Sequence, residues 1–224
     1  QLFFTGVAFY LLLGPDLTVQ KTPDIKEAVR SLNFFSSFST KDTQLSQSLW
    51  ILLGVSALTF LGYTSFDQSF NYYLKDVFDL ATSYNGSFKG AVGLISLVAT
   101  MTLGMYLVKQ TDLNKSTTYI LFICAFFMGA VCLAPGLTSF FALNLIFYGF
   151  YAISVPMVQD LITKQATPTT QGTVLGFYQA SQSFGRIIGA FIAGRLYDVN
   201  VLGPFILGSL AFLIAAIGVK IYQK

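Results

Sequence analysis

A single arginine lies in the middle of an apolar stretch near the C-terminal end of the chain. Arg186 stands within Ser183-Phe-Gly-Arg-Ile-Ile-Gly-Ala-Phe-Ile-Ala-Gly194. A guanidinium at the centre of a bilayer costs at least about 2.5–3.5 kcal/mol, so we expect Arg186 to face a protein interior or a water-filled cavity. Gln179 and Gln182 precede Arg186 at helical spacing and share its face. This polar face predicts a cavity; the alternative is that Arg186 only bonds a carboxylate or backbone carbonyls.

The same segment carries a stripe of small residues, spaced four apart: Ser181, Gly185, Gly189 and Ala193. Small residues at this spacing let the backbone of a second membrane helix approach closely. We therefore interpret the stripe as a packing surface and not as a binding site.

A second polar group lies near the end of the apolar block at 49–72, where Asp67 and Asn71 share helical spacing with Thr64 and Gln68. A carboxylate in an apolar site has a raised proton affinity, which makes Asp67 a candidate for proton coupling together with Arg186. The alternative is that Asp67 is solvated at the mouth of the protein.

Two tyrosines, Tyr148 and Tyr151, lie with Asn144 on one face of the block at 138–163, followed by Pro156. Such a face suits an aromatic, amphipathic substrate, although hydrogen bonding between helices would use the same residues. Asp160 and Lys164 are spaced as an ion pair on the same helix, either at the surface or as a latch.

The elements that must position these residues are membrane helices. The chain is 54% hydrophobic and 10% charged, with a mean hydropathy of +0.65, whereas soluble domains carry about 25% charged residues. A spanning helix needs about 20 mostly apolar residues. Six segments fit this description: 49–72, 87–108, 117–134, 138–163, 173–196 and 202–222. Their short connections predict an all-α membrane protein, an antiparallel bundle of transmembrane helices.

Other kinds of chemistry find no support in the sequence. His is absent, and Cys124 and Cys132 fit best as small core residues, so we expect neither a metal site nor a cofactor. The phosphate-binding loop, the His-Glu-x-x-His motif and the nucleophile elbow are also absent, so we expect no catalytic residues and no enzyme. A net charge of +3 is too small and too dispersed to indicate nucleic acid.

The first 47 residues differ from the rest. Residues 1–13 look like the end of a membrane helix whose start is missing, and with no initiator Met we expect a piece of a longer protein. Residues 14–47 form a polar linker, in which the segment from Thr22 to Phe35 predicts either a surface helix or a loosely ordered stretch.

The distribution of basic residues predicts the orientation. If the linker is cytoplasmic, the inner segments hold Lys21, Lys26, Arg30, Lys41, Lys109, Lys115, Lys164, Lys220 and Lys224. The outer segments then hold Lys75, Lys89 and Arg195. This bias places the linker and the C-terminus in the cytoplasm of a multi-pass protein of the cell membrane.

The stretch from Pro168 to Asp198 resembles the eleventh-helix region of the major facilitator superfamily, and most of all its drug:proton antiporter branch. The resemblance rests on Gln171-Gly172, on Gly176 and on Gly185-Arg-Ile-Ile-Gly189, although Ala190 stands where that branch usually has Pro. The segment from Phe66 to Asp76 also resembles the end of the seventh helix in bacterial drug exporters. A family motif between helices eight and nine is degraded, with Val108 in place of Asp.

The resemblance implies the C-terminal half of a twelve-helix facilitator. Residues 1–13 would end helix six, 14–47 would be the central linker, and 48–224 would be the C-terminal six-helix domain, with the N-terminal half missing. Analogy with the family implies a cavity lined by Tyr63, Asp67, Asn71, Tyr148, Tyr151, Gln179, Gln182 and Arg186.

Three functions are consistent with these features. The first is a secondary active transporter that exports hydrophobic drugs or related small molecules in exchange for protons, by alternating access. The second is a proton-coupled or facilitated transporter of a nutrient or metabolite, in which Arg186 pairs an anion. The third is a membrane receptor or scaffold that does not transport. The expected partners are the lipid bilayer, a small-molecule substrate, the proton as coupling ion, and the missing N-terminal half.

Overall fold

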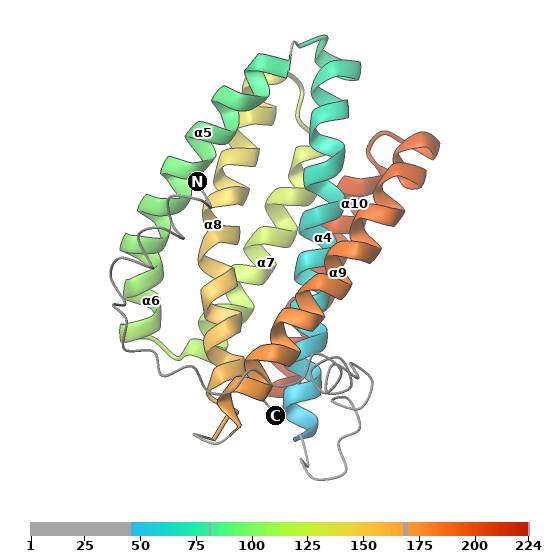
Figure 1. The fold of residues 1–224 in the computed structure, drawn as a ribbon. Coiled ribbons are helices and arrows are strands. Elements are labelled where there is room, and N and C mark those ends of the chain that lie inside the picture. The colour runs from blue at the N-terminus through green and yellow to red at the C-terminus, as the bar shows by residue number, and fades with distance from the viewer. Residues whose placement is uncertain (1–45, 81, 168–169, 224) are drawn as a thin grey trace, which may run out of the picture. The chain divides into compact units, whose positions relative to one another are not determined.

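The computed structural model describes residues 46–80, 82–167 and 170–223, and within these ranges every regular element is helical (Figure 1). The predicted all-α fold class is confirmed. The predictions for residues 1–13, and for nearly all of the linker at 14–47, lie outside the described residues. The helices are α4 (Gln47–Phe78), α5 (Thr82–Ala99), a π-helical turn η1 (Thr100–Gly104), α6 (Met105–Gln110), α7 (Leu113–Val131), α8 (Leu137–Thr163), α9 (Gln171–Val199) and α10 (Gly203–Tyr222).

The six predicted spans correspond to these helices, with boundaries that differ by a few residues. Five helical segments among the described residues are long and apolar enough to cross a membrane: Gln47–Phe78, Tyr84–Val108, Leu113–Val131, Leu137–Thr163 and Gly203–Tyr222. The sixth predicted span, 173–196, is helical in α9 but is not among these five. Glutamines, two arginines and Asp198 make α9 more polar than the other long helices.

The helices pack side by side in an order that differs from their order in the chain. Helix α5 packs on α8, α8 on α7, α7 on α10, α10 on α4, and α4 on α9 (Figure 1). Helix α4 therefore lies between α9 and α10 and also reaches α8. This arrangement lets side chains of α4, α5 and α8 meet on one side of α4, while α9 packs against a different side of α4.

The core of the bundle is rich in phenylalanine. Phe66, Phe147, Phe205 and Phe212 are fully buried. Phe66 contacts Phe147 and Phe205 with ring centroids 5.2 and 5.4 Å apart, in edge-to-face geometry. Edge-to-face pairs are favourable because the positive ring edge meets the negative face. These contacts fix α4 against α8 and α10.

Helix ends are defined by local hydrogen bonds. Ser46 caps α4 by accepting a bond from the Ser48 amide at 3.3 Å. At the other end Asp79 has a φ of 50°, and the amides of Asp79 and Leu80 each donate 3.1 Å bonds back to Lys75 and Leu74 carbonyls. This left-handed turn ends α4 six residues after the predicted boundary, because residues 73–78, among them Lys75 and Asp76, continue the helix.

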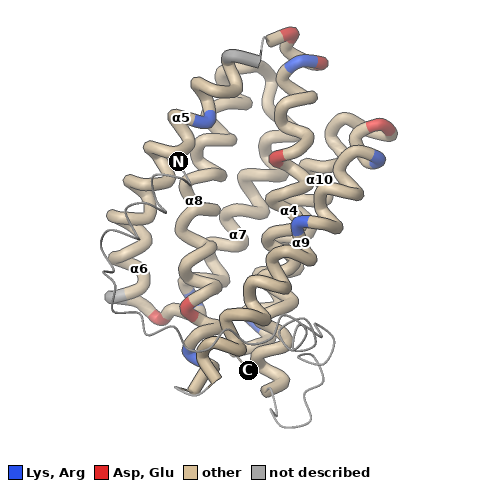
Figure 2. Tube along the Cα trace, in the orientation of Figure 1, with Lys and Arg blue, Asp and Glu red and all other residues tan. Residues whose placement is uncertain are grey.

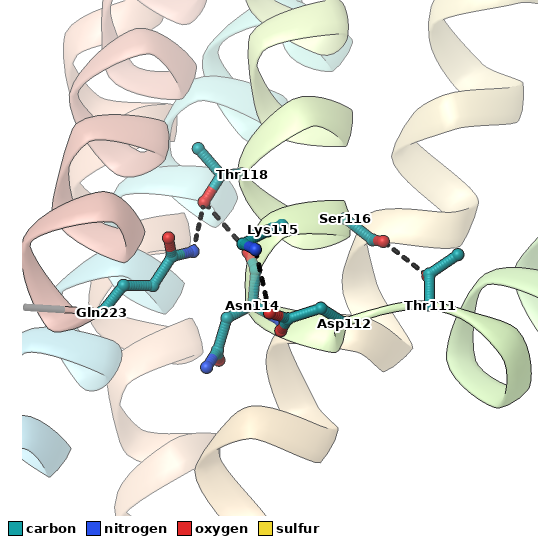
Figure 3. Close-up of polar contacts among 7 residues, drawn as sticks. All are labelled: Thr111, Asp112, Asn114, Lys115, Ser116, Thr118 and Gln223. Atoms are coloured by element: carbon teal, nitrogen blue, oxygen red, sulfur yellow. Dashed lines mark hydrogen bonds and ion pairs between the residues drawn. The ribbon is translucent and has the colours of Figure 1, made fainter.

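The turn before α7 is held by its own side chains (Figure 3). Asp112 accepts a bond from the Asn114 amide at 3.2 Å, and the hydroxyls of Thr111 and Ser116 are 2.6 Å apart. Gln223, just after α10, donates a 2.9 Å bond to the Thr118 hydroxyl. These contacts tie the end of α10 to the start of α7.

A π-helical turn interrupts the α5–α6 segment opposite a proline. Residues Thr100–Gly104 form η1, and Pro156 lies inside α8. A cavity of about 190 Å³ lies between them, lined by Gly104, Ile153 and Pro156 among others. A π-helical turn and a helix proline both weaken the regular hydrogen-bond ladder, so both helices are locally irregular at the same level.

Candidate functional site

The predicted proton-coupling residue Asp67 lies in an ion pair inside the bundle. Lys89 from α5 donates to Asp67 Oδ1 from α4. The Tyr148 hydroxyl from α8 donates to the same oxygen at 2.9 Å and accepts a 3.1 Å bond from Lys89 Nζ. Three helices therefore meet at one carboxylate oxygen, and we call Asp67, Lys89 and Tyr148 the charged triad.

The charged triad is partly screened from solvent. The side chains of Lys89 and Asp67 are 33% and 31% exposed, and Tyr148 is 3% exposed. Lys89 Nζ also lies 5.2 Å from the ring centroid of Tyr148 and 5.6 Å from that of Phe70. The ammonium is thus stabilised by a carboxylate and by aromatic faces at the same time.

Tyrosine rings lie next to the charged triad, and we call Tyr63, Tyr148 and Tyr151 the aromatic wall. Tyr63 of α4 stacks on Tyr151 of α8 with centroids 4.2 Å apart and planes 3° apart. Tyr63 also meets Tyr148 edge-on at 6.2 Å. The structure therefore brings together four of the residues that sequence predicted for the cavity: Tyr63, Asp67, Tyr148 and Tyr151.

Arg186 lies near this wall but outside the charged triad. Its side chain is exposed, and its guanidinium carbon lies 4.7 Å from the ring centroid of Phe60. Its charge interacts electrostatically with Tyr63 and Tyr151. The ion pairs among the described residues are Lys89–Asp67, Lys115–Asp112 and Lys164–Asp160, and Arg186 takes part in none of them.

The other predicted cavity residues differ in how far they are exposed. Gln182 is buried at 7% exposure, whereas Gln179 and Asn71 are exposed. At 100° per residue, Gln179, Gln182 and Arg186 lie within about 60° of one another, and Gln182 is the one of the three that packs against the bundle. The predicted pair Asp160 and Lys164 is confirmed, at 3.1 Å near the end of α8.

The small-residue stripe of α9 lies against α4. A Cβ added to Gly185 would meet the backbone of Ala57, and one added to Gly189 would lie 2.5 Å from the Leu61 carbonyl oxygen. Ala193 is 2% exposed, and the Ser181 hydroxyl donates to the Tyr178 carbonyl at 2.8 Å. At Gly185 and Gly189 only a residue without a side chain allows this approach.

Sequence reasoning missed the role of Lys89. The count of basic residues puts Lys89 on the outer side, near the start of the predicted span 87–108, and the sequence gives it no role. In the structure Lys89 lies in α5, within the candidate span Tyr84–Val108, and its ammonium donates to Asp67 and Tyr148. Most charged residues lie toward the two ends of the bundle and few along its middle (Figure 2). One feature of the sequence could have pointed to Lys89: a lysine near the start of an apolar helix needs a partner for its charge.

Comparison with protein families identifies the kind of protein to which this geometry belongs. The chain matches the family model described as Major Facilitator Superfamily over residues 2–190, which is most of its 224 residues. A search of curated proteins finds no match. Five candidate membrane spans and the family match agree on a multi-pass membrane protein built for transport of small molecules. The chain belongs to the Major Facilitator Superfamily.

Proposed function

We propose that the protein exports hydrophobic small molecules in exchange for protons, with Asp67 as the proton-binding group. The observation that carries this proposal is the charged triad, which holds a carboxylate and an ammonium between three helices. An intramembrane carboxylate with a defined partner is expensive to bury and is typical of ion-coupling sites.

Protonation of Asp67 would change what holds the three helices together. With Asp67 ionised, Lys89 and Tyr148 both bind its Oδ1 atom. When Asp67 takes up a proton it becomes neutral, and its attraction for the Lys89 ammonium falls. The protein then holds α5 less tightly against α4, which links proton binding to a movement of helices.

The aromatic wall supports a hydrophobic substrate. Tyr63 and Tyr151 stack on each other, Tyr151 is buried, and Tyr63 is the partly exposed ring that a substrate can reach. Such rings bind apolar or planar molecules by stacking and edge contacts, with hydroxyls available for a few polar contacts. A hydrophobic substrate also agrees with the resemblance of the sequence to the drug:proton antiporter branch.

The complete transporter would use both halves of the fold. In alternating access two bundles rock around a site near the midplane of the membrane. We propose that residues 48–224 are one bundle, that 1–13 and 14–47 are the end of helix six and the central linker, and that the other bundle lies in the N-terminal half. Lysine distribution supports a cell-membrane protein with its linker and C-terminus in the cytoplasm.

Arg186 favours a second candidate, a transporter of an anionic metabolite. Its guanidinium pairs with no carboxylate among the described residues, and its aromatic contact with Phe60 leaves its hydrogen-bond donors free of an acid. A guanidinium binds carboxylates and phosphates through two parallel hydrogen bonds. An anionic substrate would therefore pair with the guanidinium of Arg186.

Accumulation assays separate the two candidates. Cells with and without the complete transporter are loaded with a panel of lipophilic cations, neutral drugs and small organic acids. The export proposal expects hydrophobic compounds to accumulate more when the protein is absent. Uptake of an organic acid that requires the protein, with drug levels unchanged, would replace export with metabolite transport.

A further inference from the structure

A hollow lies away from the charged triad, between α4 and α9. It has a volume of about 580 Å³, and its lining includes Gln68, Tyr72, Asp76, Gly194, Tyr197 and Asp198. Pockets for small molecules usually measure about 300–1,000 Å³. This hollow is therefore large enough for a small organic ligand.

The hollow and the charged triad lie on different sides of α4. Asp67 binds side chains of α5 and α8, whereas the next residue, Gln68, lines the hollow beside α9. Asp76 lies nine residues after Asp67, which is about 13 Å farther along the helix. The two sites can consequently be changed independently.

The hollow lies toward the end of the bundle. Helix α4 has 32 residues, or about 48 Å at 1.5 Å per residue, which exceeds the roughly 30 Å hydrocarbon core of a bilayer. Asp76 is three residues from its C-cap, Asp79, and Asp198 is two residues before the C-cap of α9, Asn200. The hollow therefore lies beside the C-terminal ends of α4 and α9, which in the proposed orientation is the outer end of the bundle.

The charge of the lining is negative. Asp76 and Asp198 contribute two carboxylates, and no lysine or arginine is among the lining residues. Neither carboxylate is in the ion pairs of the described residues. Asp76 Oδ2 accepts a hydrogen bond from the Tyr197 hydroxyl at 3.0 Å, which orients the carboxylate without neutralising it.

Aromatic rings accompany the two carboxylates. Tyr72 and Tyr197 face each other across the hollow's edge with ring centroids 5.9 Å apart, and Tyr72 is 62% exposed. A tyrosine face attracts a cation, and its ring also covers apolar groups. Carboxylates next to tyrosines suit a cation that carries hydrocarbon.

From this geometry we infer that the hollow binds an organic cation, such as an ammonium or phosphonium ion with apolar substituents. This inference rests on the proposed function, to which it adds a binding site at one mouth of the export path. A bare metal ion fits less well, because the described residues contain no group of three or more acidic or cysteine side chains that could hold one. The two carboxylates would attract the charge and the two tyrosines would contact the substituents.

Direct binding to the purified full-length protein tests the inference. The probe is tetraphenylphosphonium, and triphenylphosphine oxide serves as a neutral probe of similar shape. We expect the cation to bind with at least about tenfold lower affinity when Asp76→Asn and Asp198→Asn are combined. The matched control is Asp160→Asn, which changes a carboxylate at another helix end and should leave binding unchanged.

A steric variant supplies a second readout. A Cβ added to Gly194 would meet open space, so Gly194→Phe can fill the hollow without a clash in the backbone. Its control is Gly176→Phe, also in open space on α9 but outside the hollow. Gly194→Phe should weaken binding of the cation, and Gly176→Phe should not.

The outcomes separate the hollow from the transport proposal. Unchanged affinity in both the carboxylate and the Gly194→Phe variants would overturn the inference, even if proton-coupled export occurs. Equal affinity for the neutral probe would also overturn it, because charge would then have no role. Selective binding that the variants weaken, in a protein without proton-coupled transport, would support the hollow and reject the proposed function.

Discussion

At the scale of single residues, the charged triad shows what a sequence can and cannot predict. Asp67 could be anticipated because a carboxylate inside an apolar block stands out. Its pairing with Lys89 could not be anticipated, because the two residues are 22 positions apart on different helices and no periodicity relates them. Tyr148 was anticipated as a wall residue, but its bond to Asp67 depends on how α8 packs near α4.

The ion pair predicts an asymmetry between single and double substitutions. Lys89→Met leaves the Asp67 carboxylate unpaired and should lower the thermal unfolding temperature in detergent. Breaking a buried pair costs about 3–5 kcal/mol, and we expect less here because both side chains are one-third exposed. The double variant Asp67→Asn/Lys89→Met removes both charges and should recover most of the loss. A double variant no more stable than Lys89→Met would show that the pair does not stabilise the bundle.

Arg186 makes a separate prediction about transport. Replacing Arg186 with Ala should abolish transport while the protein still inserts into the membrane, because the guanidinium beside the aromatic wall is lost. Arg186→Lys keeps the charge and should retain part of the activity. Transport rates and membrane abundance are measured together, and wild-type rates in Arg186→Ala would contradict the role.

At the scale of elements, the helices follow closely from apolar blocks and their breaks. The observed boundaries of α8 and α10 are within one residue of the predicted ones. Helix α4 ends six residues later than predicted, at the turn that Asp79 provides. The π-helical turn Thr100–Gly104 was not predicted, since nothing in its composition distinguishes it from an α-helix.

The contact between α9 and α4 predicts which glycines tolerate a methyl group. Gly185→Ala would press its Cβ into the backbone of Ala57 and should destabilise the protein by about 1–3 kcal/mol, the usual cost of overpacking. Gly176→Ala, on the same helix in open space, should be neutral or stabilising by up to about 1 kcal/mol. Thermal unfolding of the two variants provides the comparison. Equal stability would mean that α9 does not approach α4 as closely as the structure shows.

At the scale of the whole molecule, the sequence predicted the class of fold but not the arrangement of its helices. Hydropathy gives the number and length of helices, whereas the order α5, α8, α7, α10, α4, α9 depends on packing between residues distant in sequence. The hollow between α4 and α9 exists because these two helices are neighbours in that order. Tyr72, Asp76 and Tyr197 could not be grouped before α4 and α9 were known to be neighbours.

The predicted orientation can be tested in intact cells. Single cysteines are placed at the exposed positions Lys115 and Asn200, at opposite ends of the bundle, in a background without Cys124 and Cys132. The lysine distribution predicts that a membrane-impermeant maleimide labels Asn200→Cys and not Lys115→Cys until the membrane is opened. The reverse labelling pattern would show that the protein has the opposite orientation in the membrane.

The most direct test of the central claim is proton movement in vesicles that contain the complete transporter. Inverted vesicles with an acidified lumen and a pH-sensitive dye receive hydrophobic compounds identified by the accumulation assay. The account predicts that the lumen becomes more alkaline with the wild-type protein and with Asp160→Asn, and that it does not respond with Asp67→Asn. Wild-type proton movement in Asp67→Asn would show that the charged triad is not the coupling site.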